Sequence, residues 1–314
     1  MSDILFIKTS SLGDVIHHMP ALTDARRHMP GARIAWVVEE AFAPLVKLHP
    51  GVDDVIPVAS RRWRGSVHKT PTWQEIKNFI QLVHAGTHDD IIDTQGLFRS
   101  ALIAKLARGR RHGYDANSVR ERAASWLYDV RHPVGRDLHA VARNRILTGL
   151  ALGYAPNDAL DFGLARDKLA PASGSYGVLL HATTRREKEW PQEAWIALGR
   201  ALREHCASLV LPWGNAAERE RGERIAAGLS NARLPERRPL DEVARLIAGA
   251  SFVIGVDTGL MHLAAALGVP LVAIFVGSEP GLTGPLGTGP IAVIGGKGQM
   301  PSVTQAMGAL AQVL

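Results

Sequence analysis

The sequence has a single cysteine, Cys206, among its 314 residues. An internal disulfide is therefore excluded, and the composition suits a reducing compartment. No apolar run comes near the roughly 20 residues of a membrane-spanning helix. The first residues, M-S-D-I, also lack the basic stretch that precedes the apolar segment of a signal peptide. These absences predict a soluble, cytoplasmic protein.

Several catalytic signatures are missing as well. There is no phosphate-binding P-loop, no G-x-G-x-x-G after the first expected strand, no G-x-S-x-G elbow and no D-x-D pair. The 13 histidines do not show zinc-ligand spacing. The sequence thus predicts no metal site and no cofactor. A transfer reaction that uses backbone amides and cations in place of a metal ion remains open.

What is present is a regular alternation of strand and helix patterns in both halves of the chain. Strands are expected near 4–8, 32–38, 55–58, 90–94, 176–181, 208–211, 252–256 and 270–276. Helices are expected near 15–28, 73–84, 97–107, 216–228, 240–248, 260–267 and 302–314, with one more opening at Pro191. Such alternation is typical of α/β domains built on a parallel sheet.

The length of the chain and the polar segment 157–174, rich in Asp, Ala, Pro and Gly, predict two domains. The expected division is 1–160 and 161–314. We expect both to be Rossmann-like and to face each other across a ligand-binding cleft.

Two small polar loops follow expected strands and run into helices. Residues 8–14 read K-T-S-S-L-G-D, and residues 256–262 read V-D-T-G-L-M-H. A strand, a loop of small residues and a helix together offer free amides and a helix dipole to an anion. Asp14 could simply cap its helix, but Gly13 allows close approach of a ligand and the loop is more polar than a cap requires.

Other polar positions fit the same pattern. Lys188 lies among cations and hydroxyls in residues 181–190, which could clamp a diphosphate. Glu218 opens a helix and could hold ribose hydroxyls or only complement the helix dipole. Trp213 could flank an adenine or fill the core. Arg61, Arg62 and Arg64, with Trp63 between them, suit an acidic acceptor better than a solvated face, and the weaker candidate Arg120 could join that pocket.

Together these segments resemble the lipopolysaccharide heptosyltransferases of glycosyltransferase family 9. The resemblance rests on 8–14 with His17, 20–24, 36–40, 61–64, 93–97, 181–184 with Lys188, 190–191, 211–214, and 256–260 with His262. Residues 278–281, S-E-P-G, differ from the Asp-Pro ending more usual in the family.

The resemblance implies a GT-B fold and inverting transfer of L-glycero-D-manno-heptose from ADP-heptose to a Kdo sugar of lipid A. It further implies that the protein acts at the cytoplasmic face of the inner membrane and does not bind nucleic acid. Asp14 would be the catalytic base and Lys188 the diphosphate-binding lysine. Further donor contacts would be Thr183, Thr184, Trp213, Glu218, Asp257, Thr258, Gly259, Leu260 and His262. Acceptor contacts would be Lys8, Ser10, Ser11, Arg61, Arg62, Arg64 and Arg120.

Three alternatives stay open at this point. A heptosyltransferase acting on a later core heptose would share these motifs. A nucleotide-sugar epimerase of similar fold would bind the donor but needs no basic acceptor patch. A nucleic-acid-binding protein would explain the net charge of +6 and the pI of about 9.7, but neither the carboxylate of the first loop nor the second anion site.

Overall fold

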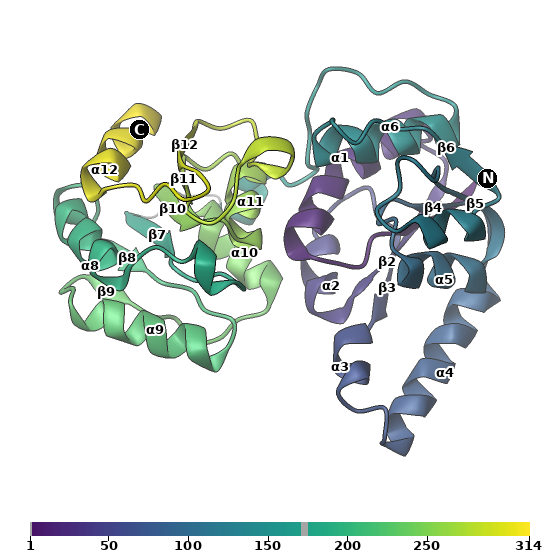
Figure 1. Ribbon diagram of the computed structural model, residues 1–314, viewed down its shortest axis with the longest axis horizontal. Coiled ribbons are helices and arrows are strands. Elements are labelled where there is room, and N and C mark those ends of the chain that lie inside the picture. Colours follow the sequence, from purple (N-terminus) through teal and green to yellow (C-terminus); the bar gives the residue numbers. More distant parts are fainter. Residues whose placement is uncertain (1, 171–174) are drawn as a thin grey trace. The chain divides into compact units, whose positions relative to one another are not determined.

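The computed structural model describes residues 2–170 and 175–314, which form two compact units, Met1–Gly163 and Leu164–Leu314 (Figure 1). The predicted division after residue 160 falls close to this boundary. Each unit is built around its own parallel sheet, and the two are described separately below.

Unit 1 holds six strands and its helices alternate with them. The strands are β1 (Asp3–Ile7), β2 (Arg33–Glu39), β3 (Asp54–Val58), β4 (Thr87–Asp93), β5 (Arg108–Tyr114) and β6 (Val130–His132). The helices are α1 (Leu12–His28), α2 (Ala43–Val46), α3 (Ser60–Arg64), α4 (Thr70–Ala85), α5 (Phe98–Leu106) and α6 (Ala140–Leu152), with 3₁₀ turns η1 (Glu40–Phe42) and η2 (Arg122–Leu127).

Unit 2 repeats the plan. Its strands are β7 (Tyr176–Leu180), β8 (Ser208–Val210), β9 (Ala232–Arg233), β10 (Phe252–Val256), β11 (Leu271–Phe275) and β12 (Ile291–Gly295). Its helices are α7 (Arg166–Leu169), α8 (Gln192–Ala201), α9 (Ala216–Ala227), α10 (Leu240–Ala248), α11 (Gly259–Ala266) and α12 (Val303–Val313), with 3₁₀ turns η3 (Arg186–Lys188), η4 (Leu202–Glu204) and η5 (Gly281–Thr283).

The two sheets share one topology. Their strand orders are β3-β2-β1-β4-β5-β6 and β12-β11-β10-β7-β8-β9, and all pairings are parallel. In each, the order reverses between the first and fourth strands of the unit. A parallel sheet binds its ligand at such a reversal, beyond the carboxyl ends of the strands. The loops after β1 and β4 in unit 1, and after β7 and β10 in unit 2, are therefore the places to look for a site.

The central strands are apolar along their whole length because helices cover both faces of each sheet. Residues 4–7 of β1 and nearly all of β10 and β11 are fully buried. In unit 1, Phe79 and Val83 bring one face of α4 into the core. In unit 2, Trp190 and Trp195 pack edge to face, with ring centroids 5.1 Å apart, in the core beneath β7 and β10.

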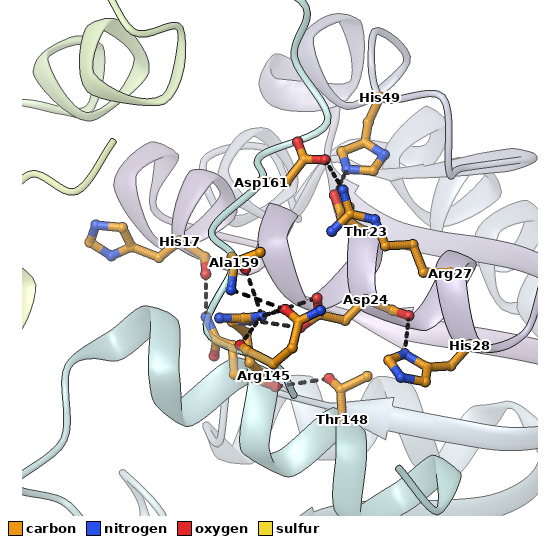
Figure 2. A network of polar contacts seen from close by, with 12 residues as sticks. His17, Thr23, Asp24, Arg27, His28, His49, Arg145, Thr148, Ala159 and Asp161 are labelled. Carbon is orange, nitrogen blue, oxygen red and sulfur yellow. Dashed lines mark hydrogen bonds and ion pairs between the residues drawn. The ribbon is translucent and has the colours of Figure 1, made fainter. Parts of the chain in front are cut away.

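Segment 157–163 differs from the predicted linker because it is bound to unit 1. Figure 2 shows Arg145 of α6 between α1 and this segment. Its guanidinium donates to Asp24 at 2.6 and 3.1 Å and to the carbonyls of Asn157 and Ala159, both at 2.9 Å. Arg27 forms an ion pair with Asp161. Residues 157–163 therefore belong to unit 1 and not to the linker predicted at 157–174. Residues 171–174 of that predicted linker lie outside the described part of the chain.

No helix in the described residues is both long enough and apolar enough to cross a membrane.

Candidate active site

The loop after β1 is fixed by hydrogen bonds from the segment that follows β4. The Gln95 side chain accepts from the amides of Thr9 and Ser10, at 3.0 and 3.2 Å, and donates to the carbonyl of Ser10. Arg99, at the start of α5, donates to the hydroxyl of Ser10 at 2.7 Å. Ser10 is thereby buried, whereas Ser11 is exposed. Residues 8–11 do form a loop between a strand and a helix, as predicted. Its conformation is fixed by residues that lie some 85 positions away in the sequence.

Asp93, at the end of β4, fixes the second loop in turn. It is fully buried and accepts from the hydroxyls of Ser100 and Tyr128, at 2.8 and 2.7 Å, and from the amides of Gln95 and Gly96. Burial raises the pKa of Asp93 even though these hydrogen bonds oppose the change. Asp93 is thus a structural carboxylate beneath the site.

Lys8 lies under the first loop rather than on its surface. It is 6% exposed, and its ammonium donates to the Thr94 carbonyl at 2.8 Å and to the Asn144 side chain at 3.3 Å. Burial lowers the pKa of Lys8, while the charge of Asp14 raises it and that of Arg120 lowers it. Lys8 thus supports the first loop from within unit 1, and the predicted acceptor residue Arg120 is exposed.

Asp14 forms a capping box with Ser11, the N-cap residue of α1. Its Oδ2 accepts from the amide of Ser11 at 2.8 Å and from the hydroxyl of Ser11 at 3.0 Å. A carboxylate has about four acceptor positions, so these two bonds leave acceptor capacity. The side chain is partly exposed at the mouth of the loop. The capping role and a role as proton acceptor are compatible.

The predicted acceptor arginines lie together on α3, which follows β3. Glu39, buried at the end of β2, accepts from the hydroxyl of Ser60 at 2.7 Å and from the amide of Arg61 at 3.0 Å, which anchors the start of α3. Arg62 is already engaged by two carboxylates: it forms ion pairs with Glu40 at 2.9 Å and with Glu75 at 2.8 Å. These bonds raise the pKa of Arg62.

The neighbouring guanidinium of Arg61 lies over the ring of Phe42, 5.2 Å from its centre. Across the described residues, neither Arg61 nor Arg64 forms an ion pair. The basic cluster at 108–112 is by contrast part of β5, where Arg110 and Arg111 form ion pairs with Asp90 and Asp129. Within the described residues Arg108 has no ion pair either and instead donates to the His84 ring at 2.8 and 3.1 Å. Arg61 and Arg64 are therefore the arginines of the predicted acceptor cluster that are best able to meet an acidic ligand.

In unit 2, the loops after β7 and β10 meet at Lys188 and Asp257. The ammonium of Lys188 donates to Oδ2 of Asp257 at 2.5 Å, and the hydroxyl of Ser278 donates to the same oxygen at 2.6 Å. Thr183 donates to the Asp257 carbonyl at 2.9 Å. Three loops are thus joined at one carboxylate.

This carboxylate stays ionised despite its environment. Burial raises the pKa of Asp257, but hydrogen bonds from Lys188 and Ser278, together with the charges of Lys188 and His262, bring it below its usual value. The next residues, Thr258, Gly259 and Leu260, form the N-cap and first turn of α11, where the leading amides have no partner within the helix. The predicted residues Lys188, Asp257–Leu260 and His262 therefore form one cluster.

A cavity of about 710 Å³ lies between the loop after β7 and the start of α9. Its lining includes the predicted Thr183, Thr184 and Glu218. It also includes Arg186, one of the cations of residues 181–190, and two arginines that the sequence did not single out, Arg221 and Arg224. Arg221 forms an ion pair with Glu189 at 3.2 Å and donates to the carbonyls of His181 and Trp190. The lining therefore holds three arginines and three glutamates, and its concave shape gives room for a small polar ligand.

Glu218 and Trp213 have local partners. The Glu218 carboxylate accepts from the amide of Gly214 and from the side chain of Asn215, both at 2.7 Å. The Trp213 indole donates to the Pro235 carbonyl at 2.8 Å, and the guanidinium of Arg219 lies 5.5 Å from its ring centre. Both side chains are partly exposed beside the turn that opens α9.

Chemically, unit 1 presents an available carboxylate near cations, and unit 2 presents cations and helix amides that can stabilise a leaving diphosphate. Among the described residues there is no group of three or more His, Cys, Asp or Glu that could hold a metal ion. Two Rossmann-type units carrying these loops define a glycosyltransferase of the GT-B fold.

Comparison with known proteins narrows this class. Residues 76–309 match the family model described as glycosyltransferase family 9 (heptosyltransferase). The lipopolysaccharide heptosyltransferase 1 of Pseudomonas aeruginosa is 46% identical over 288 residues, which cover 90% of this chain and 81% of the relative. The chain belongs to glycosyltransferase family 9.

Solved structures agree with this assignment. The E. coli heptosyltransferase WaaC with ADP matches at a TM-score of 0.93 and 39% identity, covering 99% of this chain and 100% of the other. The same enzyme with ADP-2-deoxy-2-fluoro heptose matches at a TM-score of 0.88 and 39% identity, covering 98% and 99%. The predicted fold class and family are confirmed.

Proposed function

We propose that this protein transfers L-glycero-D-manno-heptose from ADP-heptose to a Kdo sugar of lipid A, with inversion at the anomeric carbon. The observation that carries the proposal is the cluster of Lys188, Asp257 and the first turn of α11 at the strand reversal of unit 2. The similar E. coli heptosyltransferase WaaC has been solved with ADP and with a fluorinated ADP-heptose, which supports a nucleotide-sugar donor.

In the proposed reaction the Asp14 carboxylate takes the proton of the acceptor hydroxyl while that oxygen attacks the anomeric carbon. The bond from that carbon to the diphosphate oxygen breaks on the opposite face, and ADP leaves through an oxocarbenium-like state. Lys188 and the amides of Gly259 and Leu260 would stabilise the charge that develops on the diphosphate. Thr183, Thr184, Trp213, Glu218, Thr258 and His262 would complete the donor site.

On the acceptor side, Arg61, Arg64 and Arg120 would hold the Kdo carboxylate and nearby phosphate. Arg62 would help to present them through its bonds to Glu40 and Glu75. Ser11 would line the acceptor site, and Lys8 and Ser10 would support it from below. Because its acceptor is a lipid, the protein would work at the surface of the inner membrane.

The test is turnover of ADP-heptose, followed as ADP release, with Kdo-lipid A or with an acceptor that already carries its first heptose. We expect release only with the unheptosylated acceptor. Release only with the heptosylated acceptor would instead assign the enzyme to a later core position, and release without any acceptor would favour a hydrolase. Conversion of ADP-heptose to an epimer without ADP release would favour an epimerase.

We further propose that the reaction needs no divalent metal, because Lys188 and the α11 amides can take the charge of the leaving diphosphate. Turnover should therefore continue in excess EDTA at the rate measured in Mg²⁺. Loss of turnover in EDTA, with recovery on adding Mg²⁺, would contradict this.

A further inference from the structure

A helical projection of unit 1 has a tip that is both apolar and basic. It consists of residues 60–77, which run along α3, round a turn and into the first half of α4; Figure 1 shows these two helices reaching beyond the sheet of their unit. At the tip, Trp73 is 60% exposed and Val67 is 50% exposed. The Trp73 indole donates to the Val67 carbonyl at 2.8 Å, so the ring is held against the backbone of the turn that carries Val67.

The base of the projection is well fixed, so the tip is held in place. The Trp63 ring packs edge to face on Phe79, 5.7 Å between centroids, and its indole donates to Glu75 at 2.8 Å. The turn is closed by hydrogen bonds from Thr72 to Ser66 and from Ser66 to the Arg62 carbonyl, both at 3.0 Å. Exposure of the apolar residues at the tip is therefore part of an ordered element.

The projection is predominantly basic. Residues 60–77 hold five lysines and arginines and a single carboxylate, Glu75, which is already bound to Arg62 and Trp63. Over the described residues, the side chains of Arg64, Lys69 and Lys77 make no ion pair. All three are exposed. The projection that exposes Trp73 and Val67 therefore also exposes three cations without an ion-pair partner in the described residues.

We propose that the tip of the α3–α4 projection docks on an anionic bilayer, with Trp73 and Val67 entering the headgroup region and Lys69 and Lys77 contacting lipid phosphates. Tryptophan flanked by lysines is typical of membrane interfaces. Lysine is depleted from protein–protein interfaces. The inference rests on the proposed function, because a lipid acceptor would reach the arginines of α3 from the same surface.

Vesicle co-sedimentation of the whole protein tests the surface directly. The probes are vesicles of phosphatidylethanolamine with phosphatidylglycerol, and vesicles of phosphatidylcholine alone as the neutral control. We expect binding to the anionic vesicles, weakened roughly fivefold per lost cation in the double variant Lys69→Gln/Lys77→Gln. Trp73→Ser should weaken it by a similar factor or more.

Matched controls come from another part of unit 1 and from unit 2. Trp126→Ser removes a tryptophan that is 74% exposed on η2, and Lys105→Gln/Lys297→Gln removes the same charge from α5 and from the loop after β12. Both should bind like the wild type. Equal binding by the projection variants and the wild type, or a larger loss in the controls, would overturn the proposal. So would sedimentation velocity showing that Trp73→Ser dissociates a dimer without vesicles.

Two precautions keep the result interpretable. Trp73→Ser also loses the bond to Val67, so a thermal melt accompanies it, whereas the lysine pair has no such contact to lose. Activity separates the two proposals: the projection variants should keep the wild-type rate on a deacylated, water-soluble acceptor and slow only on acceptor embedded in vesicles. Absence of turnover in every assay would reject the proposed function while vesicle binding still decided the docking surface.

Discussion

At the scale of single residues, a substitution can separate the capping role of Asp14 from its proposed role as catalytic base. Asparagine keeps an oxygen that can accept the Ser11 bonds of the capping box, but it cannot take a proton. We expect Asp14→Asn to melt like the wild type and bind ADP normally, while turnover falls by about 10²–10⁴-fold. Calorimetric ADP binding and initial rates measure this, and full activity in the variant would exclude Asp14 as the base.

Ser278 is a second residue with a testable role, as a positioning residue for Lys188. It shares Oδ2 of Asp257 with the Lys188 ammonium. Removing the hydroxyl in Ser278→Ala should let the pKa of Asp257 rise and leave Lys188 less well placed. We expect ADP affinity or turnover to fall by about three- to tenfold, in line with the loss of one hydrogen bond.

Ser278→Thr is the matched control because it keeps the hydroxyl. It should retain most of the wild-type affinity, and the melting temperatures of both variants should agree. If alanine and threonine behaved alike, the hydrogen bond would have no part in placing Lys188.

Sequence reasoning proposed the chemical residues but not those that position their loops. Asp14, Lys188 and Asp257 stand in loops whose composition marks them as ligand-binding. Gln95 and Asn144 act through contacts with residues more than 80 positions away. Only the fold brings those segments together, so no local pattern could have revealed them.

At the scale of elements, the arginines of α3 are not equivalent. Arg62 binds Glu40 and Glu75, whereas Arg61 and Arg64 have no such partners in the described residues. Arg61→Ala and Arg64→Ala should raise the KM for the acceptor with an unchanged melt, each by about tenfold if one hydrogen bond to an anion is lost.

Arg62→Ala should instead lower the melting temperature, because it leaves two neighbouring carboxylates without a counter-charge. Kinetics and melts of the three variants, with the KM for ADP-heptose as the internal control, test this. A selective loss of ADP-heptose affinity in the Arg61 and Arg64 variants would contradict the acceptor assignment.

Two of the elements that the sequence missed, α6 and β5, share a physical cause. α6 was not predicted because its buried face carries Asn144 and Arg145, which bind distant groups instead of showing an apolar stripe. β5 reads R-G-R-R-H-G-Y, and its arginines are neutralised by Asp90 and Asp129 from neighbouring segments. Polar residues that are satisfied by tertiary contacts hid these two elements from pattern analysis, whereas the apolar strands β1, β7, β10 and β11 were found. The apolar strand β12, which reads I-A-V-I-G, was missed for another reason.

At the scale of the whole molecule, a buried histidine in each unit should make the folded state sensitive to acid. Burial lowers the pKa of His49 in unit 1 and of His181 in unit 2, each to about 4. Nδ1 of His49 accepts the amide of Gly51 at 3.0 Å, so it cannot take a proton without losing that bond. Both nitrogens of the His181 ring are without a hydrogen-bond partner in the described structure.

Because unfolded histidine has a pKa near 6.5, the unfolded chain binds protons below that pH while these two side chains stay neutral in the folded state. Stability should therefore be lost as the pH falls from about 6.5 to about 4, on the order of 3 kcal/mol for each histidine. Chemical unfolding at pH 7.5 and pH 5 measures the loss. His181→Leu should reduce the difference between the two, and an unchanged difference would exclude His181 as a source of the acid sensitivity.

The anchoring of residues 157–163 on unit 1 also decides how this enzyme could be recombined with relatives. Arg145 and Arg27 hold that segment through the carbonyls of Asn157 and Ala159 and the carboxylate of Asp161. A chimera joined just after α6 would give Arg145 a foreign tail and leave a buried guanidinium short of acceptors. A chimera joined after Gly163 would keep this segment with Arg145 and Arg27, and because unit 2 is proposed to bind the donor, we expect that single junction to exchange donor specificity between family members.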